Sequence, residues 1–217
     1  MGAFDYGRYK RNMDGREDSR LGKAILAIKQ ELSFTGYARP LMDASLPFFG
    51  EAVENSVKDF QKAKGLVVDG ECGQVTLREL FRKRITLIEA RYGFPNGTVG
   101  KKIALESAFD PVAVGFSDPA DKGIAQINTG IHGVTESEAF DPAFAIPWAA
   151  EYITTQKREI ERRANTLKAA RAAYNVGNYY AAEWMLAGFP PNGRVENGID
   201  WFDRATTYIR LVDAREF

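Results

Sequence analysis

Cysteine and histidine are almost absent from this sequence, which contains only Cys72 and His132 among its 217 residues. A single cysteine excludes a disulfide within the chain, and one cysteine with one histidine leaves no cluster of nitrogen and sulfur ligands for a zinc ion. Zinc-dependent amidases and peptidases are therefore excluded, and a Ser-His-Asp triad would have to use His132. A nucleophilic pair of Cys72 and His132 stays open at this point.

The sequence also lacks net charge and long apolar runs. Its 29 Lys and Arg residues balance 29 Asp and Glu residues, so no overall basic field attracts nucleic acid or an anionic surface. No segment approaches the roughly 18 apolar residues of a membrane span, and the charged residues 1–20 do not resemble a signal peptide. We expect a globular protein with no nucleic-acid partner and no membrane span, made in a cytoplasm and without a signal for export.

Apolar residues recur at helical spacing along most of the chain. After a polar arm at residues 1–18, the first such face extends from a cap at Asp18 or Ser19 to Gly36. Further helices are expected from Val53 to Gly65, from about Thr76, and at about 98–108, 147–163, 166–175, 179–186 and 203–213, with Pro147 in a first turn. Because no segment shows a convincing alternating strand pattern, the sequence predicts an all-α protein.

Residues 19–82 contain a short internal repeat. The segments 49–53 (FGEAV) and 72–76 (CGQVT) occupy corresponding places, so two similar turn-helix units are expected to pack together, with Cys72 as a small core residue in the place of Phe49. Segment 60–73 (FQKAKGLVVDGECG) resembles the signature of the peptidoglycan-binding domain-1 family. The resemblance implies a three-helix module that binds bacterial cell walls without catalysis. The residues that match its motif are Phe60, Gln61, Asp69, Gly70 and Gly73.

The second half of the chain carries one carboxyl group in an unusual setting. Glu106 follows an apolar Ile-Ala-Leu run and precedes Phe109, so it ends an apolar helix, and Pro111 disfavours helix at Asp110. A carboxylic acid partly shielded from water tends to keep its proton, as a general acid requires. On this pattern alone, however, an ordinary solvated glutamate at a helix end is the better interpretation.

Two further segments change that interpretation. Residues 123–128 (GIAQIN) carry two amides suited to sugar hydroxyls and acetamide groups, and residues 173–177 (AYNVG) carry a phenol and an amide. In order, E-S-x-F-D-P, G-x-x-Q-I-N and A-Y-N-x-G resemble the three motifs of the soluble lytic transglycosylase family, within a resemblance over about residues 84–213. It implies a lysozyme-like α-helical catalytic domain at 83–217, of the kind that goose-type lysozymes share.

The resemblance also implies roles for single residues. Glu106 would be the acid/base catalyst, and Tyr174 would hydrogen-bond to it and orient it. Tyr208, at the substrate site, would share this role with Tyr174, unless it only packs. The remaining motif residues would contact the glycan: Ser107, Gln126, Asn128 and Asn175. For Asn128 the alternative is a turn cap, and His132 is expected in a loop near the groove.

One segment departs from the family pattern. Before G-x-x-Q the sequence reads SDPADK at 117–122, where the family commonly has Ser-x-x-Gly-Ala. Asp118 and Asp121 are interpreted as parts of a solvated loop, and the alternative is a second catalytic carboxylate in a lysozyme-type hydrolase. Goose-type lysozymes tend to have Asp where this chain has Asn128, which favours a transglycosylase that forms 1,6-anhydro sugars.

These resemblances together predict a cofactor-free, metal-free enzyme that binds peptidoglycan through 19–82 and cleaves the MurNAc–GlcNAc β-1,4 bond through 83–217. Without a signal peptide, we expect a monomeric phage endolysin of the host cytoplasm that reaches the wall after a separate holin-like protein opens the membrane. A virion-borne enzyme and an enzyme secreted by another route are alternatives. A non-catalytic wall-binding protein and an unrelated helical interaction protein are alternatives of other classes.

Overall fold

The computed structural model describes residues 7–40, 42–161, 195–196, 199–200, 207, 210–211 and 214. The helices of the first 161 residues are α1 (Ser19–Thr35), α2 (Glu51–Ala63), α3 (Gln74–Arg91), α4 (Thr98–Glu106), α5 (Glu136–Ala139) and α6 (Pro142–Glu161). Two short antiparallel ribbons accompany them: β1 (Asp121–Lys122) with β2 (Ile127–Asn128), and β3 (Val195–Glu196) with β4 (Ile199–Asp200). The all-α prediction is confirmed, because helices make up most of the ordered elements. The strands have only two residues each, which is too short to give the sequence an alternating pattern.

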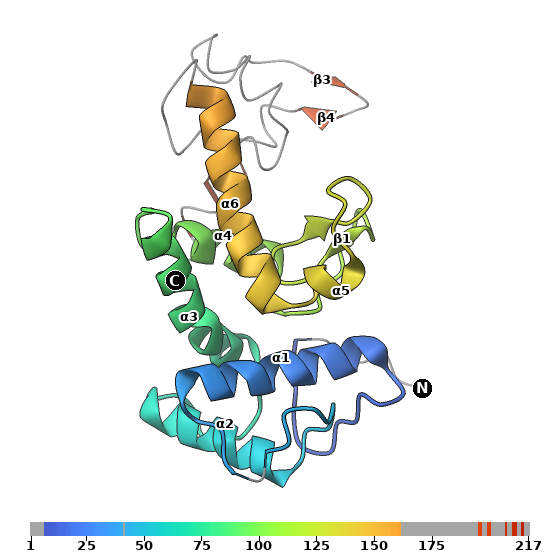
Figure 1. Ribbon diagram of the computed structural model, residues 1–217, viewed down its shortest axis with the longest axis vertical. Coiled ribbons are helices and arrows are strands. Elements are labelled where there is room, and N and C mark those ends of the chain that lie inside the picture. Colours follow the sequence, from blue (N-terminus) through green and yellow to red (C-terminus); the bar gives the residue numbers. More distant parts are fainter. Residues whose placement is uncertain are drawn as a thin grey trace.

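Figure 1 shows two lobes joined by α3. The lower lobe contains α1 and α2, and the upper lobe contains α4, α5, α6 and the β1–β2 hairpin. Helix α3 packs against α1 in the lower lobe and against α4 and α6 in the upper lobe. The expected division of the chain between residues 82 and 83 lies inside this helix, so no flexible linker separates the lobes there.

Helix α1 begins and ends at its predicted capping residues. The side chain of Asp18 accepts hydrogen bonds from the backbone N–H groups of Arg20 and Leu21, and Gly36 ends the helix with a left-handed φ of 90°. The predicted apolar face is buried in the core: Leu21, Ile25, Ile28 and Leu32. Burial of this face against α2 and α3 stabilises the lower lobe.

The N-terminal segment, residues 7–18, lies against both lobes. Tyr9 is buried and exchanges two backbone hydrogen bonds with Cys72 of the lower lobe, and its hydroxyl donates to Asp110 Oδ1 of the upper lobe at 2.7 Å. Cys72 is itself fully buried, which confirms it as a core residue. Burial raises the pKa of its thiol, so Cys72 is unsuited to act as a nucleophile.

Helix α6 begins earlier than the sequence predicted. It starts at Pro142, directly after Asp141, whose Oδ1 accepts a hydrogen bond from the Ala143 N–H at 2.9 Å. Pro147 therefore lies inside the helix, and its expected place in a first turn was wrong. The helices expected at 166–175 and 179–186, and most of that at 203–213, lie outside the described residues. Within the described part of the chain, no helix is long and apolar enough to cross a membrane.

A buried ion pair joins α1 to α3. Arg84 Nε donates to Glu31 Oε1 at 2.6 Å, and the Glu31 side chain is fully buried. Its second oxygen, Oε2, has no hydrogen-bond partner among the described residues. Burial raises the pKa of Glu31 to about 7, the negative charge of Asp141 adds to the increase, and Arg84 opposes it. Glu31 is thus a buried carboxyl group that changes charge near neutral pH.

This arrangement predicts a pH-dependent stability. The folded-state pKa of Glu31 lies above its ordinary value, so between about pH 4.5 and 7 the folded protein binds more protons than the unfolded chain. The free energy of unfolding should therefore fall as the pH rises through this range, by on the order of 3 kcal/mol from this group. Glu31→Gln should flatten the dependence, as measured by urea denaturation at a series of pH values. The exposed Glu17→Gln is the control, and an unchanged slope in Glu31→Gln would contradict the assignment.

Candidate active site and wall-binding cleft

Glu106 is the last residue of α4, at the point where the helix stops. Ala108 and Phe109 follow with left-handed φ values of 52° and 68°. Residues other than glycine rarely adopt this conformation, and it is concentrated at functional sites. The chain therefore turns sharply away from α4, and the Glu106 side chain is 23% exposed at the end of a mostly buried helix.

A buried ammonium group lies beside this carboxyl group. Lys102, one helical turn earlier, places its Nζ 2.8 Å from Glu106 Oε1, and its side chain is only 4% exposed. Burial lowers the pKa of Lys102 to about 8, although Glu106 opposes the decrease. The apolar neighbours of Glu106 in the sequence do not reveal Lys102 as a site residue. The i, i+4 spacing of Lys102 and Glu106 was the available signal.

A carboxylate from α3 fixes the other end of α4. Glu89 is buried, and its two oxygens accept hydrogen bonds from the backbone N–H groups of Gly97, Val99 and Gly100 at 2.7–3.0 Å. These N–H groups belong to the first turn of a helix, where no partner within the helix is available, and a carboxylate there also complements the helix dipole. Glu89 therefore anchors the helix that carries Glu106, a role that no local sequence pattern indicates.

Ser107 connects the end of α4 to the loop of the second motif. Its hydroxyl donates to the backbone oxygen of Ile124 at 2.7 Å, and in that loop Gln126 Nε2 donates to the backbone oxygen of Gly123 at 2.9 Å. Gly123 has a φ of 74°, and a Cβ atom at this position would lie 1.7 Å from the backbone oxygen of Ala139. The glycine of the motif is thus required by close packing against the end of α5. Glycan contacts by Ser107 and Gln126 stay predictions.

Asp118, Asp121 and Asn128 form one hydrogen-bonded cluster. Asn128 Nδ2 donates to Asp118 Oδ2 and to Asp121 Oδ1, both at 2.9 Å, and Asn128 Oδ1 accepts from the Gly130 N–H. Burial raises the pKa of Asp121, and Asp118 and Glu106 add to the increase, while Asn128 opposes it. Asn128 thus stabilises the hairpin loop, in line with the alternative that it caps a turn. A direct contact between Asn128 and glycan stays a prediction.

An aromatic group lies near this loop. His132 meets the rings of Trp148 and Tyr152 edge-on, with centroids 5.1 and 5.0 Å away, and Trp148 stacks on Tyr152 at 4.9 Å. Burial lowers the pKa of His132, although Asp121 opposes the decrease, so the ring is mainly neutral at neutral pH. His132 is therefore a loop residue packed on α6.

In the lower lobe, the predicted wall-binding motif has a structural role. Gln61 is buried, and its Nε2 donates to Asp69 Oδ1 at 2.8 Å, while its Oε1 accepts from the Gly70 N–H at 2.9 Å. Phe60 is a core residue, Gly70 has a φ of 77°, and Gly73 precedes α3 as its N-cap. These residues hold the loop between α2 and α3 in shape.

The surface beside this loop is hollowed. A cavity of 480 Å³ is lined by Gly7, Arg8 and residues of the segment Leu66–Thr76. Val67 and Val75 at its edge are 79% and 53% exposed. Exposed apolar side chains next to carboxylates and a guanidinium suit a ligand with both sugar and peptide parts, so this cavity is the candidate wall-binding cleft.

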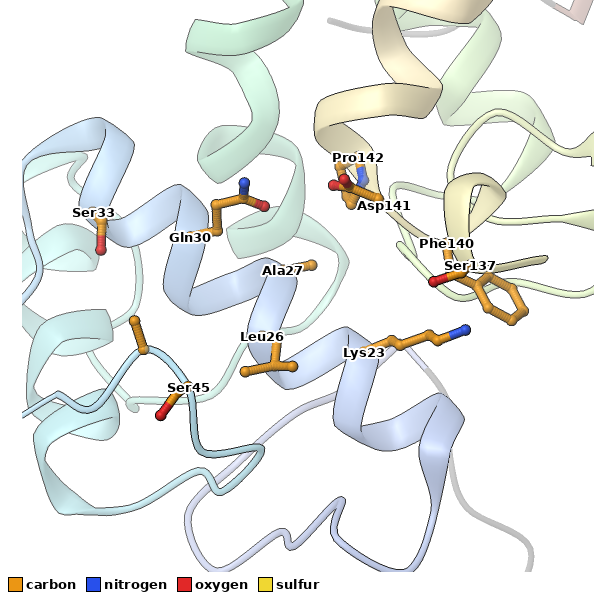
Figure 2. A pocket seen from close by; sticks show the side chains of 11 residues that line it. Lys23, Leu26, Ala27, Gln30, Ser33, Ser45, Ser137, Phe140, Asp141 and Pro142 are labelled. Carbon is orange, nitrogen blue, oxygen red and sulfur yellow. The ribbon is translucent and has the colours of Figure 1, made fainter. Parts of the chain in front are cut away.

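A second cavity, of 530 Å³, opens between the lobes. Figure 2 shows α1 on one side of it and the junction of α5 and α6 on the other. Lys23 extends from α1 towards Phe140, and its Nζ lies 5.3 Å from the ring centroid. Glu106 does not line this cavity, which is therefore separate from the candidate catalytic group.

Three predicted site residues lie outside the described residues: Tyr174, Asn175 and Tyr208. Their roles beside Glu106 stay predictions. Within the described residues, no group of three His, Cys, Asp or Glu side chains is arranged to hold a metal ion.

Comparison with protein families gives two adjacent matches. Residues 21–80 match the model of the peptidoglycan binding domain family, and residues 85–187 match the transglycosylase SLT domain. No curated protein matches the sequence. The chain thus joins a domain of the peptidoglycan-binding family to a transglycosylase SLT domain, as the motifs indicated. It is a peptidoglycan-degrading lytic enzyme of the lytic transglycosylase class, although the limits of its two domains stay a prediction.

The packing of Gly123 predicts a selective loss of activity. In Gly123→Ala, the new methyl group overlaps the backbone of Ala139, so the loop that Ser107 joins to Glu106 must move. We expect wall lysis to fall at least tenfold, because small displacements near reacting groups cost about that much or more. Turbidity of a cell-wall suspension measures lysis, and sedimentation with walls should show unchanged binding. Gly130→Ala, whose Cβ would meet Asn128 Oδ1 at 3.4 Å, is the control; equal activities in the two variants would contradict this account.

Proposed function

We propose that the protein is a phage endolysin that cleaves the MurNAc–GlcNAc β-1,4 bond of peptidoglycan and leaves 1,6-anhydroMurNAc ends. The observation that carries the proposal is the setting of Glu106. This carboxyl group is partly exposed at the end of a buried helix, and Ser107 joins the helix end to the loop of the second motif. Such a group can reach a bound glycan while its own backbone stays fixed, as general acid catalysis requires.

In the proposed reaction, Glu106 acts first as an acid and then as a base. Its carboxyl proton passes to the glycosidic oxygen while the bond between that oxygen and C1 of MurNAc breaks. The resulting carboxylate accepts the proton of the C6 hydroxyl of the same MurNAc, and the C6 oxygen forms a bond to C1. Protons and charges balance, Glu106 regains its proton, and no water is consumed.

The acids of the hairpin loop support this choice over hydrolysis. Hydrolysis with inversion requires a second carboxylate roughly 6.5–9.5 Å from the first, with a water molecule between them. Asp121 is the better candidate of the two, because its charge interacts with that of Glu106. However, both Asp121 and Asp118 accept hydrogen bonds from Asn128, which favours a role in loop structure. A lysozyme-type hydrolase that uses Asp118 or Asp121 is the second candidate function.

The reaction products distinguish these two functions. We expect mass spectrometry of digested walls to show anhydro-muropeptides, which are lighter than reducing-end products by one water. Asp118→Asn and Asp121→Asn should retain these products, because neither carboxylate takes part in the proposed reaction. Glu106→Gln keeps the shape of the side chain but has no transferable proton, so its lysis should fall about 10²–10⁴-fold. Reducing sugars as products, together with an inactive Asp118→Asn or Asp121→Asn variant, would establish the hydrolase instead.

The endolysin role is supported by the combination of the two domains in one chain. The wall-binding cleft and Glu106 belong to lobes that α3 joins without a linker, so binding to the wall holds the catalytic group close to its substrate. An endolysin of this kind acts when another protein permeabilises the cytoplasmic membrane.

Expression in a bacterium tests this role. Cells that accumulate the protein in the cytoplasm should stay intact until an agent such as chloroform permeabilises the membrane, and should then lyse rapidly. Culture turbidity measures the effect, and Glu106→Gln, expressed at the same level, should not lyse the treated cells. Lysis before permeabilisation would instead indicate an enzyme that is exported by its own route.

A further inference from the structure

Lys102 is a buried cation that packing alone does not explain. Only 3% of the residue is exposed, and its helix neighbours Val99 and Ile103 are buried apolar residues. Removing an ammonium group from water costs several kcal/mol. Replacing buried ion pairs with apolar side chains of similar volume often leaves the folded protein as stable or makes it more stable. Lysine is among the residues least often buried. A role for the charge itself is therefore the better explanation.

The charge of Lys102 is directed at one oxygen of Glu106. The distance of 2.8 Å from Nζ to Oε1 is that of a charge-assisted hydrogen bond. The two residues lie one turn apart on the same helix, so the contact needs no loop to form it. Because the amine is almost fully buried and the carboxyl group is partly exposed, Lys102 approaches Glu106 from the protein side and leaves the outer side of the carboxyl group for a glycan.

We propose that Lys102 is a positioning residue for Glu106, and that its ammonium group stabilises the carboxylate that forms when Glu106 gives its proton to the glycosidic oxygen. This inference rests on the proposed function of Glu106. While C1–O bond cleavage is in progress, the proton leaves Glu106 and negative charge develops on the carboxyl group next to the fixed ammonium. When the C6 hydroxyl returns a proton to Glu106, that charge disappears. Lys102 keeps its own three protons throughout.

Other titratable groups lie on the elements around this pair. Asp121 of β1 interacts electrostatically with both members, and Asp118 and His132 affect Asp121 in turn. Glu89 of α3 binds the opposite end of α4. On α6, burial raises the pKa of Tyr152, which is neutral in the working range. Lys102 is thus the cation that the structure places in direct contact with Glu106, within the part of the chain that it describes.

The pH profile of Lys102→Met tests the proposal. In the wild type, the ammonium favours loss of the Glu106 proton, so activity declines on the alkaline side when the acid is lost. Without Lys102, the carboxyl group should keep its proton to a pH about 1–3 units higher, which is the effect of an opposite charge at this distance. The alkaline limb should move up by that amount. The maximal rate should fall about ten- to a hundredfold, because the new carboxylate lacks its partner.

Lys101→Met is the matched control, since it makes the same change at the next position of α4. It should keep the wild-type pH profile, and thermal denaturation together with wall sedimentation should show that both variants fold and bind. A purely structural Lys102 predicts a lower rate with an unmoved alkaline limb, and that result would overturn the proposal. An unchanged rate and an unchanged profile would overturn it as well.

A second measurement does not depend on a stable Lys102→Met variant. NMR titration of the Lys102 Nζ should give a pKa near 8 in the wild type and a lower value in Glu106→Gln, because the carboxylate raises it. Coupling between two sites is reciprocal, so an equal pKa in both proteins would refute the stabilisation of Glu106 by Lys102. Full lysis by Glu106→Gln would instead refute the proposed function, so the two failures can be told apart.

Discussion

The capping of α4 by Glu89 is the contact on which the geometry of the active site depends. Glu89 belongs to α3, the helix that both lobes share, and its carboxylate holds the first turn of α4. Because a helix is rigid over its length, fixing that turn also fixes Glu106 at the other end. Glu106 is therefore positioned from the helix that also packs against the lower lobe.

The segment that follows Glu106 is also held from the N-terminal part of the chain. Tyr9 reaches across from the lower lobe to Asp110, and Arg20 Nε of α1 donates to the backbone oxygen of Val112 at 2.7 Å. Ser107 joins the end of α4 to the second motif, and Gly123 packs that motif against the end of α5. The N-terminal segment, α1 and α3 thus all contact the upper lobe, either in the segment that follows Glu106 or at the helix that carries it.

The sequence predicted those features that depend on neighbouring residues. The ends of α1 follow from Asp18 and Gly36, and the end of α4 follows from its apolar run and the turn before Pro111. The contacts of Glu31 with Arg84 and of Tyr9 with Asp110 join residues that are 53 and 101 positions apart, and no local pattern reveals them. Pro147 was placed incorrectly because its ring suits a first helical turn, whereas Asp141 and Pro142 already begin the helix.

Directional polar contacts join the lobes in addition to an apolar core that is continuous through both of them. Buried charged pairs contribute little net stability, because removing both charges from water offsets much of their attraction, but a hydrogen bond to a defined atom fixes an orientation. Apolar packing alone tolerates small sliding movements. A catalyst that must deliver a proton to one atom does not tolerate such movements. The buried carboxyl groups of Glu31, Glu89 and Asp110 therefore serve orientation, whereas Glu106 is partly open to solvent, as the proposed proton transfer to a substrate requires.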